Sequence, residues 1–159
     1  MKAAVVHDFN APPRYDEFPM PHAQAGETLV QVRAAALSQL VKAQASGRHY
    51  SSGKQLPLVP GVDGIGLLAD GRRVYFAFPR KGQGAMAQTS VVALENCVAV
   101  PDSVDDITAA AIANPGMSSW AALIDRARFV RGEQVLINGA TGASGRLAIQ
   151  IARHLGASR

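Results

Sequence analysis

The residues with the clearest chemical potential form a short turn between an apolar segment and a helical segment. The turn reads Ala140-Thr141-Gly142-Ala143-Ser144-Gly145, and it follows the apolar segment at 134–138 (QVLIN). After the turn, apolar residues recur at helical spacing until Gly156, which supplies a stop: Leu147, Ala148, Ile151 and Leu155. A strand, turn and helix in this order aim backbone N–H groups and the positive end of the helix dipole at a phosphate. The sequence therefore predicts a diphosphate-binding turn.

The glycine spacing of this turn departs from the full G-x-G-x-x-G fingerprint. Ala140 takes the first glycine place, whereas Gly142 and Gly145 hold the second and third. The missing side chain at the second place lets a diphosphate approach the backbone, and the one at the third lets the helix pack closely on the strand. Glycines also collect in turns that bind nothing, so the spacing alone leaves a purely structural turn open.

Three upstream segments accompany the turn in a fixed order: 56–66 (LPLVPGVDGIG), 71–74 (GRRV) and 117–123 (MSSWAAL). As a set they resemble the medium-chain dehydrogenase/reductase superfamily, and the chain is similar to its zinc-free, quinone-oxidoreductase-like (zeta-crystallin-like) members from Met1 to Arg159. The resemblance implies an α+β fold. A GroES-like, partly open β-barrel would come first, followed by the first strand, turn and helix of a Rossmann domain, as in the N-terminal portion of a longer enzyme.

A change in apolar periodicity divides the chain into two predicted domains. Short strands separated by Pro and Gly are predicted at 3–7, 29–34, 65–68, 74–78, 87–92 and 98–100. A helix then follows at 104–113, capped by Ser103 and ended by Pro115 and Gly116, and a second helix begins near Ser118. We therefore expect a GroES-like substrate and catalytic domain over 1–125 and the start of a dinucleotide-binding Rossmann domain over 126–159.

The positions at which zinc-containing relatives bind their metal carry other residues here. Ser38 stands at the cysteine position, and Gly61-Val62-Asp63 stands where those relatives have Gly-His-Glu. Valine cannot ligate a metal, and a serine hydroxyl is a poor zinc ligand beside a thiolate. The structural zinc lobe is also missing, because 83–96 contains no cysteine. We expect no metal at either site.

The resemblance also implies which residues line the substrate cleft. The segment 37–50 matches the family stretch near the nicotinamide, and Ser38 and Tyr50 are its catalytic candidates, although the usual Asn, Pro and Asp of that stretch are replaced. Tyr50 is equally well explained as a packed ring with its hydroxyl at the surface. Lys42 and Arg48 are candidates to neutralise a phosphate or a substrate carboxylate, but isolated charges of this kind are usually just solvated.

Cofactor contacts are expected from two segments. Ser118 stands where the family has a threonine that approaches the nicotinamide, and a helix N-cap is the alternative role for it. The complete predicted set is Ser118, Ala140, Thr141, Gly142, Ala143, Ser144 and Gly145. The acid that contacts the ribose stands about 20 residues beyond the glycines, which lies past Arg159. We expect NADP as the cofactor, with NAD not excluded.

Composition and charge exclude several other functions. The chain has 159 residues, of which 48% are hydrophobic and 18% charged, as in a soluble globular protein. No apolar run approaches the ~20 residues of a membrane span, and Asp8 comes too early for a signal peptide, so a cytoplasmic location without a membrane partner is expected. The net charge of +4 arises within 120–159, without dense Lys/Arg runs or interleaved aromatic residues. Nucleic-acid binding is therefore not expected.

Together these patterns favour an NAD(P)H-dependent oxidoreductase that transfers hydride to a quinone or conjugated carbonyl without zinc. A nicotinamide supplies the hydride in such a reaction, while the protein supplies position and exclusion of water. One alternative is an alkenal or enoyl-thioester reductase, because the glycine turn contacts only the cofactor. Another is a non-catalytic, crystallin-like binding or structural protein. The sequence leaves a homodimer open.

Overall fold

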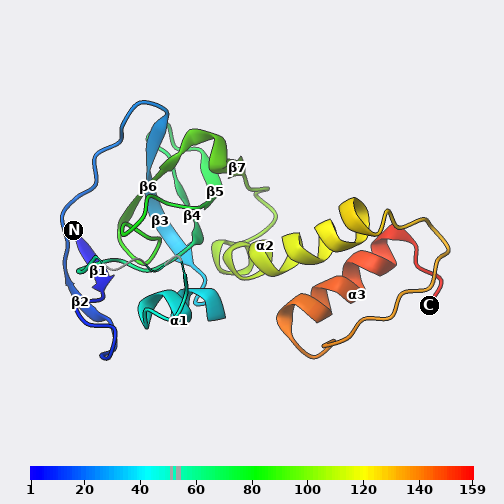
Figure 1. The fold of residues 1–159 in the computed structure, drawn as a ribbon. Helices are drawn as coiled ribbons and strands as arrows, with labels where there is room; N and C mark the ends of the chain where they lie inside the picture. Colours follow the sequence, from blue (N-terminus) through cyan, green and yellow to red (C-terminus); the bar gives the residue numbers. More distant parts are fainter. Residues whose placement is uncertain (51, 53–54) are drawn as a thin grey trace. The chain divides into compact units, whose positions relative to one another are not determined.

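The structure is a computed structural model that describes residues 1–50, 52 and 55–159 (Figure 1). The chain divides into two compact units, Met1–Ala110 and Ala111–Arg159. Each unit is described by itself below. None of the described helices is both long enough and apolar enough to cross a membrane.

The first unit is built from two antiparallel sheets. One pairs β1 (Lys2–Val5) with β2 (Arg14–Glu17). The other has the order β6-β3-β4-β5-β7, and its strands are β3 (Glu27–Ala35), β4 (Asp63–Leu67), β5 (Arg73–Ala77), β6 (Thr89–Ala93) and β7 (Cys97–Ala99). Isolated bridges, such as Ala3 with Ala87 and Val6 with Leu58, connect the N-terminal strand to later segments. Among the described residues the strands do not close into a complete barrel, which agrees with the predicted α+β class and its partly open β-barrel.

The six strands predicted in this unit are confirmed, with ends that shift by one or two residues, and three short elements were not predicted. The first is β2, whose sequence Arg-Tyr-Asp-Glu is mostly exposed and lacks an apolar face. The second is α1 (Gln39–Ala45), a helix of 7 residues. A short 3-10 helix, η1 (Leu94–Asn96), joins β6 to β7.

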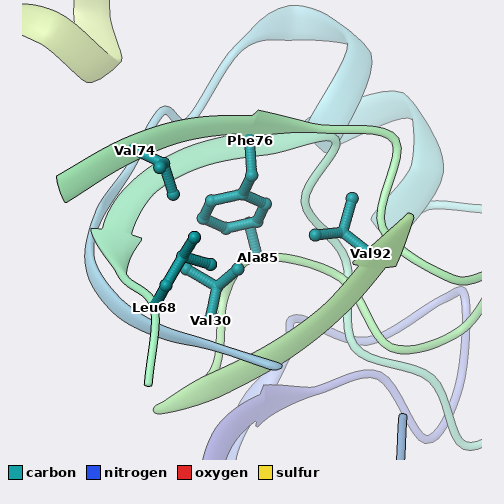
Figure 2. Packing of buried hydrophobic residues seen from close by; sticks show 6 residues of the cluster. All are labelled: Val30, Leu68, Val74, Phe76, Ala85 and Val92. Atoms are coloured by element: carbon teal, nitrogen blue, oxygen red, sulfur yellow. The ribbon is translucent and has the colours of Figure 1, made fainter. Parts of the chain in front are cut away.

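A compact hydrophobic cluster holds the larger sheet together (Figure 2). Its buried members are Val30, Leu68, Val74, Phe76, Ala85 and Val92. They come from strands β3, β5 and β6 and from the connecting segments, and the ring of Phe76 lies among the smaller aliphatic side chains. Half-buried Cys97 packs against this cluster, and burial raises the pKa of its thiol. Cys97 is therefore a small hydrophobic residue with little thiolate character.

Two glycines in β4 allow its close approach to neighbouring strands. A Cβ atom at Gly64 would lie 3.0 Å from ring atoms of Phe76, and one at Gly66 would meet the backbone of Gln31. Strand β3 shifts register by one residue between Val32 and Ala34, opposite these positions. Glycine within a strand commonly marks such a bulge or close approach. The Gly-Ile-Gly pattern at 64–66 therefore serves sheet packing.

Helix α2 (Asp106–Ala121) begins at a different cap from the one predicted. The Thr108 N–H donates to Asp105 Oδ1 at 2.9 Å, so Asp105 rather than Ser103 caps the helix. A hydrogen bond from the Thr108 side chain is the leading cause of the lowered pKa of Asp105, and this backbone bond is the second. From β5, Arg73 donates to Asp106 Oδ1 at 2.8 Å and to two backbone carbonyls just before the helix. The first turn is thereby fixed to the sheet.

The predicted helix break at Pro115 and Gly116 is wrong. Helix α2 runs through both residues to Ala121 and continues as one π-helical turn, η2 (Ala122–Arg126). A proline removes one N–H donor but leaves the following residues free to adopt helical dihedral angles. The alanine-rich sequence around it has high helix propensity, which favours continuation. Ser118 consequently lies inside a helix and not at its start.

In the second unit, the turn leads into α3 (Ala143–Leu155), as predicted. Gly156 ends this helix in the left-handed region at φ 93°, where a residue without Cβ is favoured. The segment 134–138 was predicted to be a strand, but the structure assigns no strand there, and the segment joins no sheet within the described residues. The Val135 N–H donates to Arg159 O at 2.9 Å, and the Ser158 N–H donates to Glu133 O at 3.0 Å. The last residues of the chain thus satisfy part of the backbone that a neighbouring strand would otherwise pair.

Candidate functional site

The glycine turn folds tightly back on itself before α3. Gly139 adopts φ +72°, and its N–H donates a hydrogen bond to Asn138 Oδ1 at 2.9 Å. The Gly142 N–H donates to Gly139 O at 3.1 Å, which closes the turn. Gly142 then serves as the N-cap of α3 in an extended conformation, without a side-chain cap. The backbone reversal therefore depends on Gly139, a position that the fingerprint does not include.

The start of α3 presents unpaired donors. Within the described chain, the N–H groups of Ala143, Ser144 and Gly145 donate to no protein acceptor, and the first intrahelical bond runs from Arg146 N–H to Gly142 O at 2.9 Å. The first turn of the helix contains no acidic side chain. Unpaired N–H groups and the positive dipole end of a 13-residue helix together favour an anion. The hydroxyl-bearing Thr141 and Ser144 are exposed beside them.

The two fingerprint glycines have different surroundings. A Cβ atom at Gly145 would lie 2.8 Å from Ala140 Cα and would overlap the carbonyl group of Gly139. At Gly142 the nearest atom to such a Cβ is Gly139 O at 3.6 Å, which is an ordinary contact. Gly145 is also buried, whereas Gly142 is exposed. The protein's own packing therefore requires glycine at 145 but not at 142.

A buried serine that was not predicted fixes the start of α3 to α2. The Ser119 hydroxyl lies 2.9 Å from Ser144 O and 3.2 Å from Pro115 O, so its single proton can be donated to either carbonyl. Ser119 is 8% exposed, whereas its neighbour Ser118 is exposed. The signal in the sequence was a serine four residues after a proline. The hydroxyl of a helical serine commonly bonds to the carbonyl four residues before it, which predicts the contact with Pro115 O but not the one with Ser144 O.

The other predicted site residues lie as follows. Ser118 is exposed on α2, and its hydroxyl donates to Asn114 O at 3.3 Å, so it does not act as an N-cap. Ser38 caps α1, and its hydroxyl accepts a hydrogen bond from the Val41 N–H at 3.3 Å. Tyr50 is 94% exposed, with its ring centroid 4.2 Å from that of His49. Ser38 precedes α1 and Tyr50 follows it in the chain, whereas residues 140–145 form a turn and the first residues of α3.

The position of the family's Gly-His-Glu motif is occupied by a buried carboxyl group. Asp63 is 2% exposed, and its Oδ2 accepts a hydrogen bond from the Tyr75 hydroxyl at 2.9 Å. Its Oδ1 atom is buried without a hydrogen-bond partner in the described structure. Burial raises the pKa of Asp63 above its ordinary value, and the bond from Tyr75 offsets this only in part. A carboxylate left half-satisfied in this way destabilises the fold when it is ionised.

We expect Asp63→Asn to remove a pH dependence of stability. Because the folded-state pKa of Asp63 is raised, the folded protein holds this proton more tightly, and the free energy of unfolding falls as the pH rises from about 4 through the folded-state pKa. Asparagine cannot ionise, so the variant should gain stability relative to wild type over this range. Urea unfolding at a series of pH values measures the difference.

Asp70→Asn is the control, because the contribution of Asp70 to the free energy of unfolding changes with pH in the opposite direction. Hydrogen bonds from the Arg72 backbone and side chain lower the pKa of Asp70, so its contribution to stability is lost as the pH falls. A difference between Asp63→Asn and wild type that stays constant with pH would contradict the assignment of a raised pKa to Asp63.

Comparison with known proteins gives a consistent result, although no protein-family model matches the chain. The chain is 29% identical over 191 residues to a probable NADPH-dependent quinone reductase of Emericella nidulans, covering 100% of this chain and 54% of that protein. It is 32% identical over 166 residues to the quinone oxidoreductase of Lama guanicoe, covering 96% of this chain and 49% of that protein. The chain thus spans about half the length of these curated relatives.

Solved structures agree with the sequence relatives. The quinone oxidoreductase of Thermus thermophilus, which has been solved alone and in complex with NADPH, superimposes with a TM-score of 0.84 at 29% identity, covering 99% of this chain and 51% of that one. An alcohol dehydrogenase superfamily protein of Novosphingobium aromaticivorans gives a TM-score of 0.88 at 29% identity, with 99% and 51% coverage. The predicted resemblance is therefore confirmed, and the chain belongs to the quinone-oxidoreductase-like members of the medium-chain dehydrogenase/reductase superfamily.

Proposed function

We propose that the turn at 139–145 binds the diphosphate of a nicotinamide dinucleotide, with NADPH preferred, in a reductase of quinones or conjugated carbonyls. The observation that carries this proposal is the start of α3, where three adjacent N–H groups lack protein acceptors. Beside them lies Gly142, where the protein's own packing would accept a side chain, so the space is free for a ligand. The relatives named as NADPH-dependent or quinone-reducing enzymes support the choice of cofactor and substrate.

The residues present fit the diphosphate of such a cofactor. The N–H groups of Ala143, Ser144 and Gly145 would donate to phosphate oxygens, and the Thr141 and Ser144 hydroxyls lie beside them as further donors. Bound nicotinamide would supply hydride to the substrate. Ser118 is proposed as a further cofactor contact, and Ser38 and Tyr50 are proposed as catalytic residues. The division into a substrate domain over 1–125 and a cofactor domain over 126–159 is also part of the proposal.

We also propose that the reaction is zinc-independent. Val62 is buried and has no ligand atom, and the Ser38 hydroxyl already accepts the Val41 N–H. Among the described residues, no group of three or more His, Cys, Asp or Glu side chains is arranged to hold a metal ion. The side chains at these positions therefore do not fit a zinc site.

We also propose that the protein is located in the cytoplasm.

Oxidation of NADPH by the complete gene product, followed by its absorbance with 1,4-naphthoquinone or an enone as acceptor, tests this proposal. We expect turnover that depends on the acceptor, exceeds that with NADH and persists after dialysis against a chelator. No acceptor-dependent oxidation with either substrate class would contradict the reductase assignment. Loss of turnover on chelation, restored by zinc, would instead contradict zinc independence alone.

A further inference from the structure

A pocket in the first unit lies between α1 and the loop that follows β1. Its apolar wall comes from four separate parts of the chain and includes Phe9, Leu37, Val41, Ala45, Pro60 and Met86. The cavity volume is about 360 Å³, which is within the range of small-molecule sites. The pocket therefore has the size of a ring system with a short chain attached.

The pocket is preformed rather than assembled from mobile side chains. Pro12, Pro13 and Pro60 all line it, and each has a restricted backbone. The ring of Phe9 packs against Gly47 at the end of α1, where an added Cβ would lie 2.7 Å from the ring. Leu37 is 63% exposed at this site, so the protein leaves an apolar side chain open to solvent. A ligand that covers it gains hydrophobic free energy at little ordering cost.

One charged side chain lies on this mostly apolar lining, whose other polar members are the neutral Asn10 and Ser46. Lys42 lines the pocket and is exposed, and no described carboxylate lies within ion-pair distance of its ammonium group. The nearest acid in the adjoining loop, Asp8, already accepts hydrogen bonds from the Asn10 backbone and side chain at 2.9 and 3.2 Å. The charge on Lys42 is therefore uncompensated within the described chain. Arg48, the next cation along the chain, does not line the pocket.

We infer that this pocket binds a small amphipathic anion, with an apolar ring in the cavity and a carboxylate beside Lys42. The apolar lining selects the ring, and the uncompensated ammonium group selects the negative charge over a neutral group of equal size. This inference goes beyond the proposed reductase function, because it concerns residues of the first unit alone and requires no cofactor. The site gives the protein a means of discriminating acidic from neutral ligands.

Paired probes test the inference on the 159-residue chain. Titration of the isotope-labelled protein with phenylbutyrate and with the corresponding phenylbutanol should move the amide signals of Leu37, Val41 and Ala45 in both cases. The acid should bind about threefold more tightly than the alcohol at low salt, as for an exposed ion pair. That preference should shrink at about 0.5 M salt, where the Debye length falls to about 4 Å.

Three variants locate the charge and the cavity. Lys42→Gln should abolish the preference for the acid, whereas Arg48→Gln, with the same change in net charge in the same segment, should keep it. Ala45→Phe should weaken both probes by filling the cavity. Equal affinity of wild type for acid and alcohol, or an equal effect of the two charge variants, would overturn the inference. The titration contains neither NADPH nor an acceptor, so its result and that of the NADPH-oxidation assay are obtained independently.

Discussion

Replacing Gly142 by valine should lower the affinity of the complete protein for NADPH by about tenfold to several thousandfold. A side chain at this N-cap points into space that no protein atom occupies more closely than 3.6 Å, so the space is free for a phosphate. Valine would fill it and withdraw one or two charge-assisted hydrogen bonds from the start of α3, each contributing about 1.5–3 kcal/mol. Fluorescence titration with NADPH measures the change in dissociation constant.

Stability separates this effect from damage to the fold. Gly142 has φ −77°, which valine adopts without strain, so the free energy of unfolding should fall by no more than about 1 kcal/mol through the poorer cap. Gly142→Ala is the graded control, with an affinity between those of wild type and the valine variant. Wild-type NADPH affinity in Gly142→Val would show that the turn is purely structural and would remove the main support for the proposed function.

Replacing Gly145 by valine should instead destabilise the second unit by about 3 kcal/mol or more. The added Cβ would overlap the carbonyl of Gly139 and lie 2.8 Å from Ala140 Cα. Overpacking typically costs about 1–3 kcal/mol, and here the obstructing atoms are backbone, which cannot rotate away. Urea unfolding of the 159-residue chain, followed by circular dichroism, measures the loss.

Gly116→Ala is the matched control for the valine at 145. An added Cβ at Gly116 would lie 3.8 Å from Leu147 Cδ1, an ordinary contact, and alanine favours a helix over glycine by about 1 kcal/mol. This variant should therefore keep or raise stability. If Gly145→Val unfolded at the same urea concentration as wild type, the turn and α3 would not be packed as the structure shows.

Sequence patterns predicted the strands of the first unit because burial leaves a local trace. Strand β3 has buried Val30 between exposed residues, and glycines or prolines separate the other strands. Strand β2 has no such trace, because Tyr15 is 79% exposed and the strand is defined only by its pairing with β1. A strand that is stabilised only by main-chain hydrogen bonds to its partner cannot be predicted from its own side chains.

Competing local signals explain the errors around α2. Serine and aspartate are both favoured N-caps, so Ser103 and Asp105 are competing candidates. In the structure Asp105 accepts the Thr108 N–H, and Arg73 binds the next residue, Asp106. Pro115 is a strong break signal, but propensity is readily overridden by context. The turn at 140–145 was predictable because the spacing of its glycines is a local sequence pattern. The structural need for glycine at 145 and not at 142 depends on distances between an added Cβ and neighbouring atoms, which the sequence pattern does not give.

The bond from Ser119 to the start of α3 has a consequence for how this family of sequences can diverge. The acceptor that the Ser119 hydroxyl reaches on α3 is the main-chain carbonyl oxygen of Ser144, at 2.9 Å, and not the Ser144 side chain. Any amino acid at 144 offers the same acceptor, so substitutions there keep the anchor intact. Position 119, by contrast, needs a small residue with a hydroxyl. Selection on this contact therefore acts on position 119 only. Positions 119 and 144 are expected to evolve without covariation.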